Sequence, residues 1–235
     1  MTWFSLSNAE IEVLVLSVKV AVGSMTLALP PALLFGLLLA RRNFPGKSLL
    51  DGLLCLPLVL PPVTTGYLLL LCLGRRSWIG TFLESCFGMR LSFTMLGAII
   101  ASMVVSFPLV LRAVRIAFEM IDPRLEAAAG TLGAPPWQVY LRVTLPLALP
   151  GIINGALLGF ARSMGEFGAT ITFAGNIAGE TRTVPLAVYS LMQVPGEENA
   201  AFKLVLISVI ISFAAMAGSE WLNRRARRNI TGDRA

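Results

Sequence analysis

The chain has 235 residues, of which 56% are hydrophobic and only 14% are charged, and its formal net charge is +6. Together with a mean hydropathy of +0.77, this composition excludes an ordinary soluble domain. The sequence contains no histidine, which excludes acid–base chemistry that depends on an imidazole. Its three cysteines have no spacing typical of a metal site or a disulfide framework. We therefore expect neither a metal nor a cofactor.

Five segments are long and apolar enough to cross a bilayer, which takes about 20 residues for a hydrocarbon core about 30 Å thick. They cover residues 13–40, 49–73, 93–115, 145–164 and 204–221. Little chain remains between them, so we expect a single all-α integral membrane domain over residues 1–235. The alternative, a buried helical core in a large soluble protein, is disfavoured because the connections could not cover so much apolar surface.

Each of the first three segments contains proline, which removes a backbone donor and kinks a helix. In a bilayer such a break persists only where neighbouring helices, hydroxyl groups or water satisfy the freed carbonyls. A packing kink explains any single proline. Three kinked spans in one small protein favour a bundle with a pathway and moving parts. The prolines are Pro30, Pro31, Pro57, Pro61, Pro62 and Pro108.

Basic residues gather in alternate connections, and the bias of Lys and Arg toward the cytoplasm orients a membrane protein. The far connections carry fewer basic residues and have acidic neighbours. This pattern predicts a multi-pass membrane protein with its N-terminus outside and its C-terminus in the cytoplasm, and no nucleic-acid partner. The basic residues on the predicted cytoplasmic side are Arg41, Arg42, Lys47, Arg112, Arg115, Arg124, Arg142, Arg224, Arg225, Arg227, Arg228 and Arg234.

Residues 165–200 are too rich in glycine and charge to cross lipid as a plain helix. Residues 184–194 have helical character but are too short to span a bilayer. We therefore expect an excursion on the outer face, with a loop and a short amphipathic helix before the last span. Counting residues 184–194 as a sixth span would place the basic tail outside, against the charge rule.

Two short motifs resemble those of enzymes but lack essential residues. The run Pro45–Ser48 ends like a phosphate-binding loop, yet that motif needs a glycine where Arg41 stands. Ala161–Gly165 imitates a nucleophile elbow, but Ala161 replaces its first glycine and no histidine is present to activate Ser163. The chain is therefore expected to be neither an ATPase nor another enzyme.

A polar connection over residues 122–142 interrupts the apolar sequence on the predicted cytoplasmic side. It combines an Ala-rich helix candidate with a glycine that would end it. This segment resembles the cytoplasmic coupling loop of ABC importer permeases, in which an Ala-rich triplet, a glycine and a hydrophobic residue before Leu-Pro recur at fixed intervals. The family's triplet usually begins with Glu, whereas here Glu126 precedes the triplet by one residue. The resemblance implies an ATPase contact through Glu126, Ala127, Ala128, Ala129, Gly133 and Trp137.

A second polar segment follows the fourth span. Arg162 and Glu166 stand four residues apart, so they share a helix face if the helix continues, and an ion pair between them is favoured over direct contact of Arg162 with a substrate. The nearby hydroxyl groups would bind an anion weakly enough to release it. We expect the translocation pathway or its gate to include Arg162, Ser163, Glu166, Thr170 and Thr172.

Three longer stretches carry a narrower resemblance: FPGKSLLDGLLCLPLVLPPVTTGYLLL, SFPLVLRAVRIAFE and FARSMGEFGATITFAGNIAGETRTVPLAVY. They resemble the molybdate ABC transporter permeases over nearly the whole chain. This resemblance implies the type I ABC importer permease fold, with about five transmembrane helices and a cytoplasmic coupling helix. It also implies a homodimer in the bacterial inner membrane, with its N-terminus in the periplasm. This homodimer would work with an ATP-binding subunit dimer and a periplasmic oxyanion-binding protein.

The same machine carrying sulfate or tungstate is an alternative, because nothing in the sequence measures ionic radius. A stand-alone channel or secondary transporter is an alternative of another class. It is disfavoured because secondary transporters usually show paired repeats with broken helices, and no internal repeat is found.

Overall fold

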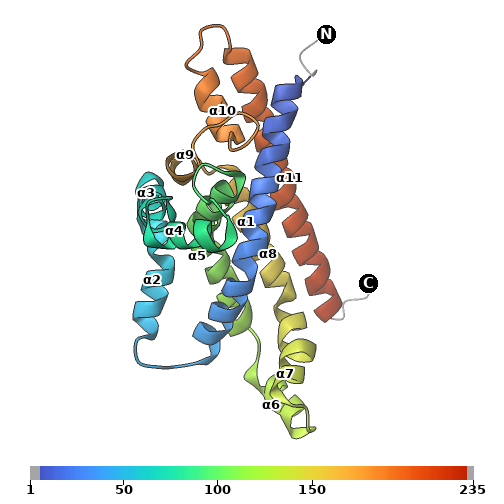
Figure 1. Ribbon diagram of the computed structural model, residues 1–235. Helices are drawn as coiled ribbons and strands as arrows, with labels where there is room; N and C mark the ends of the chain where they lie inside the picture. Colours follow the sequence, from blue (N-terminus) through green and yellow to red (C-terminus); the bar gives the residue numbers. More distant parts are fainter. Residues whose placement is uncertain (1–5, 232–235) are drawn as a thin grey trace.

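The computed structural model describes residues 6–231 of the chain. Residues 1–5 and 232–235, which include Arg234 of the basic tail, lie outside it. Over the described residues the protein is helical and has no strand. Four long helices run side by side through the molecule (Figure 1): α1 (Asn8–Arg41), α5 (Met95–Glu119), α8 (Leu145–Met164) and α11 (Glu198–Thr231).

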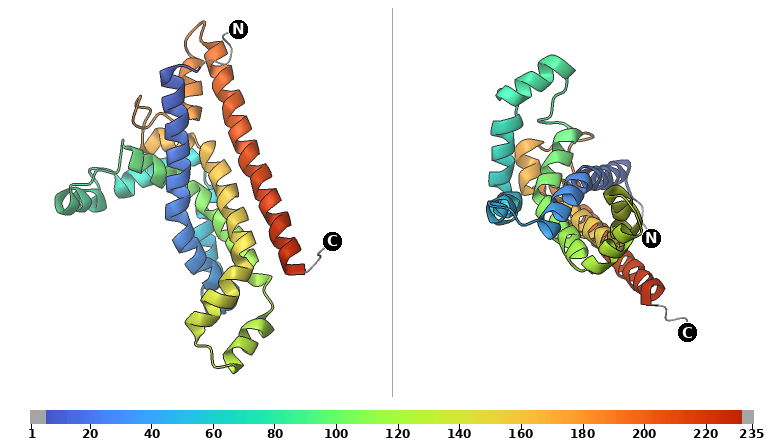
Figure 2. Two further views of the ribbon diagram at one scale, coloured as in Figure 1. Left: turned by 90° about the vertical axis from the view of Figure 1, so that its right-hand side faces the viewer. Right: turned by 90° about the horizontal axis from the view of Figure 1, so that it is seen from below.

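Shorter elements occupy the two ends and one side of this bundle. Helix α10 and the starts of α1 and α11 lie at one end, and α6 and α7 lie at the opposite end (Figure 1). Helices α3 and α4 extend sideways, away from the long helices (Figure 2). The shorter elements are α2 (Lys47–Val59), α3 (Pro62–Leu73), α4 (Trp78–Phe87), α6 (Pro123–Thr131), α7 (Pro136–Val139), the π-helix η1 (Tyr140–Thr144), α9 (Gly168–Phe173) and α10 (Val184–Leu191).

The main core lies between α1, α5 and α8 and depends on small residues. Ala28 and Ala32 of α1 are fully buried in it. A Cβ on Gly155 of α8 would lie 2.9 Å from the Cβ of Ala113 on α5, which is too close for a side chain. Membrane helices associate through such close backbone approach, because apolar burial alone gives no advantage over lipid.

Four helices are long and apolar enough to span a membrane: Asn8–Arg41, Met95–Glu119, Pro136–Met164 and Glu198–Gly218. They correspond to the first, third, fourth and fifth predicted spans. Pro30 and Pro31 lie inside the first of these helices without breaking it.

The expected second span, residues 49–73, is a pair of helices with a sharp bend at its prolines. It consists of α2 and α3, which are bent by 114° at a short break. At 1.5 Å per residue each half is about 20 Å long, so only the pair together has the length of a span. The bend follows from Pro61 and Pro62, because proline lacks an N–H and keeps the preceding residue out of the helical region. Leu60 is extended accordingly, with ψ of 143°.

The fourth span begins earlier than expected. The helix starts at Pro136 and continues through η1 into α8, so the last residues assigned to the 122–142 connection are helical. Proline is well suited to a first turn, where its missing N–H has no partner to lose. Within η1 the Leu145 N–H bonds to the Tyr140 carbonyl, and this wider turn directly precedes Pro146. Trp137 therefore belongs to the start of the spanning helix.

The predicted excursion over residues 165–200 contains two short helices. Helix α10 matches the expected short helix and is 8 residues long, too short to span. Helix α9 was not predicted. It packs on α3 through two glycines: a Cβ on Gly66 would lie 2.7 Å from the Ala169 carbonyl oxygen, and one on Gly168 would lie 2.8 Å from the Cβ of Pro62.

Candidate functional site

Helix α6 is bounded by strong local signals at both ends. The Asp122 carboxylate accepts a hydrogen bond from the Arg124 N–H at 2.9 Å, and Pro123 opens the first turn. At the other end Gly133 has φ of +85°. The Ala134 N–H bonds to the Ala129 carbonyl at 3.2 Å and the Gly133 N–H bonds to the Gly130 carbonyl at 3.0 Å. These two bonds form a Schellman motif, which confirms that position 133 needs a left-handed backbone.

The surface of α6 and of the turn that follows it is exposed and partly apolar. No residue of α6 is buried, and Ala127 and Ala128 are exposed while Ala129 is half-buried. Leu132 is 88% exposed, Trp137 61% and Leu125 49%. Large apolar side chains that protrude from an otherwise polar segment are typical of protein–protein docking sites.

Glu126 differs from its neighbours because its carboxylate bonds within the chain. Its Oε1 accepts hydrogen bonds from Arg41 Nη2 at 2.9 Å and from Thr144 Oγ1 at 2.7 Å. The Arg41 guanidinium also donates to the Ile121 carbonyl at 3.4 Å. We call Arg41, Glu126 and Thr144 the latch. It joins α6 to the end of α1 and to η1.

The latch is the main polar attachment of α6 to the bundle. A groove of about 540 Å³ lies between the last turns of α1 on one side and α6 and η1 on the other. On the side that faces this groove, the side chains of α6 do not pack closely against α1. Sequence analysis missed the latch because Arg41 lies 85 residues before Glu126. Arg41 and Glu126 are evident as charged residues in the sequence, but nothing local indicates that they meet each other or Thr144.

The expected ion pair between Arg162 and Glu166 is present. Arg162 Nη1 lies 2.8 Å from Glu166 Oε2, and the two side chains are 36% and 2% exposed. Helix α8 ends at Met164, so the pair joins the end of that helix to the following segment. The second carboxylate oxygen of Glu166 accepts from the Ala169 N–H at 2.9 Å, in the first turn of α9. A carboxylate is favourable at that end of a helix.

The hydroxyl residues of the same segment divide into two groups. Ser163 is buried, and its hydroxyl lies 2.9 Å from that of Ser24 on α1 and 3.3 Å from that of Ser106 on α5. Thr170 is fully buried, and within the described chain its hydroxyl has no hydrogen-bond partner. Thr172 is half-buried and donates to the Gly168 carbonyl at 2.8 Å. In this conformation Ser163, Glu166 and Thr170 lie inside the subunit, and only Arg162 and Thr172 of the five expected pathway residues reach a surface.

Residues 6–231 contain no cluster of three or more His, Cys, Asp or Glu side chains that could hold a metal ion.

The sequence of this chain is similar to those of known membrane transport proteins. Residues 32–228 match the model of the binding-protein-dependent transport system inner membrane component. The chain is 53% identical over 221 residues to the molybdenum transport system permease protein ModB of Haemophilus influenzae, covering 94% of this chain and 96% of that protein. It is 39% identical over 191 residues to the sulfate transport system permease protein CysW of Synechocystis, covering 78% and 69%.

Solved structures agree on the fold. A bacterial ABC transporter involved in the import of the acidic polysaccharide alginate has a chain that superposes with a TM-score of 0.74 at 16% sequence identity, covering 94% of this chain and 80% of that one. At this level of identity the similarity concerns the fold alone. The chain belongs to the family of inner-membrane components of binding-protein-dependent transport systems, and within it to the molybdenum transport permeases.

Proposed function

We propose that this chain is the membrane-spanning subunit of an ABC importer that carries molybdate into the cytoplasm, driven by ATP hydrolysis on a separate subunit. The observation that carries this proposal is 53% identity, over nearly the full length of both chains, to a molybdenum transport permease. The sequence lacks a phosphate-binding loop, because Arg41 stands where the motif needs glycine. The chain is therefore a transport subunit without enzymatic activity of its own, and a partner must supply the energy.

Helix α6 and its exposed turn are the surface that fits an ATP-binding partner. Helices α6 and α7 lie at the end of the molecule opposite the start of α1 (Figure 1), and the side chains of Leu132 and Trp137 in this segment are exposed. The alanines of α6 have small side chains, so the helix is narrow enough to enter a cleft on a partner. In this proposal Ala127, Ala128, Ala129, Gly133 and Trp137 form or shape the contact with the ATP-binding subunit.

Glu126 takes a different role from the alanines beside it. Its carboxylate is occupied by Arg41 and Thr144, so it acts as a positioning residue within the subunit. When closure of the ATP-binding dimer displaces α6, the latch passes that movement to α1 and to the helix that begins at Pro136. A packed bundle with two discrete arrangements would then change the side from which it is open.

The translocation pathway is proposed to run between two copies of the subunit, beside the segment from Arg162 to Thr172. Arg162 is held by Glu166 and is therefore not a free cationic trap for an anion. The buried hydroxyls of Ser163 and Thr170 would face the pathway only after the bundle rearranges. A periplasmic oxyanion-binding protein would deliver the substrate to the outer face.

The proposed orientation places the N-terminus in the periplasm and the C-terminus in the cytoplasm. It rests on the distribution of Lys and Arg and on the position of α6 at the end opposite the start of α1 (Figure 1). Helix α11 contains the basic residues Arg224, Arg225, Arg227 and Arg228. It starts near α10 and runs toward the end of the molecule where α6 lies.

Sulfate and tungstate are the alternative substrates, and the 39% identity to a sulfate permease is the observation that keeps sulfate under test. Uptake of labelled molybdate should be measured in cells that lack their own molybdate permease and express this chain with its ATP-binding and binding-protein partners. We expect uptake that excess molybdate or tungstate suppresses and that equimolar sulfate leaves unchanged. Suppression by sulfate to the same extent would reassign the substrate.

A further inference from the structure

A cavity of about 610 Å³ lies where α3, α4 and the start of α5 meet. Helix α5 begins beside this cavity and ends just before α6, so the cavity and the coupling segment lie at opposite ends of one spanning helix. At 1.5 Å per residue, the 25 residues of α5 separate the two by about 37 Å. The proposed orientation therefore puts the cavity on the outer side of the protein.

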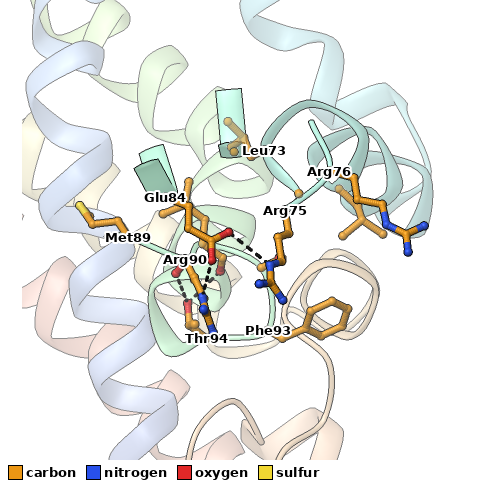
Figure 3. Close-up of a pocket in the computed structure, with 13 residues that line it drawn as sticks. Leu73, Arg75, Arg76, Glu84, Met89, Arg90, Phe93 and Thr94 are labelled. Carbon is orange, nitrogen blue, oxygen red and sulfur yellow. Dashed lines mark hydrogen bonds and ion pairs between the residues drawn. The ribbon is translucent and has the colours of Figure 1, made fainter. Parts of the chain in front are cut away.

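Arginines dominate the charge of this cavity. Its lining contains Arg75, Arg76 and Arg90, and Glu84 is its one acidic residue. Figure 3 shows the side chains of Arg75 and Arg90 converging on the Glu84 carboxylate, whereas Arg76 points away from it. The lining of this cavity has a formal charge of three positive groups against one negative group, a net +2.

Both converging arginines use the same nitrogen for the shared carboxylate. Arg90 Nε donates to Glu84 Oε1 at 2.8 Å, and Arg75 Nε donates to Glu84 Oε2 at 3.2 Å. The terminal nitrogens of both guanidinium groups are thus left available, and the side chains are 63% and 67% exposed. The hydrogen bond from Arg90 lowers the pKa of Glu84, so this carboxylate stays ionised and keeps the two arginines oriented.

The backbone that carries the arginines is also fixed. The Arg75 carbonyl accepts a hydrogen bond from the Thr81 hydroxyl and the Arg90 carbonyl accepts one from the Thr94 hydroxyl, each at 3.3 Å. Phe93 lies between Arg90 and α5 with φ of +60°, a strained conformation for a bulky residue. Its N–H bonds to the Phe173 carbonyl of α9 at 3.2 Å, which secures the connection to a helix far away in sequence.

The geometry points to a binding site for a tetrahedral oxyanion group in this cavity, held by the free terminal nitrogens of Arg75 and Arg90. Guanidinium groups bind such anions through paired, charge-assisted hydrogen bonds. The high exposure of both arginines and the competing carboxylate of Glu84 keep the affinity low, as a site of transient capture requires. The inference rests on the proposed function, which identifies the anion as molybdate. It adds the site at which the protein first binds this anion.

The same chemistry occurs in two sources, a free dianion and the phosphate of an anionic lipid. Apolar residues also line the cavity, among them Leu70, Leu73 and Leu91, and these would suit an acyl chain. The test therefore measures both ligands. The complete permease–ATPase complex is placed in nanodiscs of neutral phosphatidylcholine, without ATP or binding protein, and molybdate binding is measured by equilibrium dialysis. A parallel sample contains phosphatidylglycerol, and retained lipid is counted by native mass spectrometry.

The decisive variant is Arg75→Gln/Arg90→Gln, with Arg112→Gln as the control, because Arg112 is an exposed arginine outside the cavity. We expect the double variant to bind molybdate about a hundredfold more weakly, since removing the charge-assisted hydrogen bonds of each arginine costs roughly tenfold. Retention of phosphatidylglycerol that the double variant loses would instead assign the site to lipid phosphate. Arg75→Lys/Arg90→Lys, which keeps the charge, should bind with intermediate affinity.

Equal binding of both ligands to wild type and to the double variant would overturn the inference, provided that the variant melts at the wild-type temperature. That result would leave the transport function untouched, because uptake is measured separately. Conversely, binding that depends on the arginines in a complex that takes up no molybdate would support the site and refute the proposed function.

Discussion

Arg41 at the end of α1 donates a hydrogen bond to Glu126 of α6 at 2.9 Å, across 85 residues of sequence. The side chains are 21% and 24% exposed, so the pair is only partly screened by solvent. Thr144 of η1 donates to the same carboxylate oxygen at 2.7 Å. Hydrogen bonds therefore tie α6 to two membrane helices, α1 and the helix that begins at Pro136.

Removing the latch should uncouple ATP hydrolysis from transport. Glu126→Ala leaves the Arg41 guanidinium without its carboxylate and loses charge-assisted hydrogen bonds worth about 1.5–3 kcal/mol each. We expect the permease–ATPase complex to assemble, to hydrolyse ATP, and to import much less substrate per ATP. The ratio of uptake to phosphate release in proteoliposomes measures this effect.

Glu119→Ala is the matched control for that experiment. Glu119 pairs with Arg115 one turn earlier on α5 and its side chain is 43% exposed, while Arg115 keeps its second partner, Asp51, at 2.9 Å. Its loss should leave the ratio of uptake to hydrolysis unchanged. If both variants lowered the ratio equally, the latch would have no special role.

Gly133 should be replaceable only by residues that accept a left-handed backbone. No atom lies within 4 Å of a Cβ built at this position, so the penalty comes from the backbone alone, about 1–2 kcal/mol for most L-residues. We expect Gly133→Val to weaken assembly with the ATPase, measured by co-purification, while the bundle keeps its melting temperature. Gly133→Asn should be milder because Asn tolerates this conformation.

Gly130→Ala controls for the added methyl group. Gly130 lies within α6, also has open space around it, and does not have a positive φ. Alanine is favoured over glycine in a helix by about 1 kcal/mol, so this variant should assemble normally. Assembly of Gly133→Val at the wild-type level would contradict a role for the turn in docking.

The ion pair at the end of α8 should show an asymmetry between its two members. Glu166 is 2% exposed and Arg162 is 36% exposed. Arg162→Gln would leave the buried Glu166 carboxylate with the Ala169 N–H as its remaining described partner. Glu166→Gln would keep an acceptor for that N–H, and the Arg162 guanidinium that loses its partner reaches solvent. Burying an unpaired charge is the costlier change, so Arg162→Gln should lower the thermal stability more.

The charge-reversed double variant Arg162→Glu/Glu166→Arg extends this test. It restores an ion pair but places a donor where the Ala169 N–H needs an acceptor. We expect assembly and uptake to recover in part relative to either single reversal. A double variant that assembles fully yet transports nothing would indicate that Arg162 contacts the anion directly.

The features that sequence predicted are those with local causes. Hydropathy over about 20 residues predicts long helices because each one crosses the apolar layer by itself. The turn at Gly133 was predictable because a helix end needs a left-handed residue within a few positions. The short helix over Val184–Leu191 followed from local composition in the same way.

The features that sequence did not predict depend on contacts between distant segments. Pro61 and Pro62 indicate a kink, but the bend of 114° also requires a surface for α3, which α9 supplies through Gly66 and Gly168. Thr170 is fully buried in this conformation, which its polar side chain did not indicate, and its place at the pathway stays a prediction. Glu126 was expected to contact a partner, and its contacts to Arg41 and Thr144 become visible only in three dimensions.

Membrane topology offers a direct test of the proposed orientation. A reporter fused after Arg228 should report cytoplasm, and one inserted within residues 75–85 should report periplasm, because α5 separates the cavity side from the α6 side. Alkaline phosphatase and green fluorescent protein fusions measure the two locations. The same compartment at both places would refute an outer cavity and an inner α6.

The measurement that tests the central claim most directly is uptake by proteoliposomes that contain this chain and its ATP-binding partner. With the binding protein outside and ATP inside, we predict that labelled molybdate accumulates against its gradient. Omitting ATP or the binding protein should abolish the accumulation, and Glu126→Ala should reduce it while hydrolysis continues. Accumulation without ATP, or passive equilibration through this chain alone, would show a channel or secondary transporter and contradict the account.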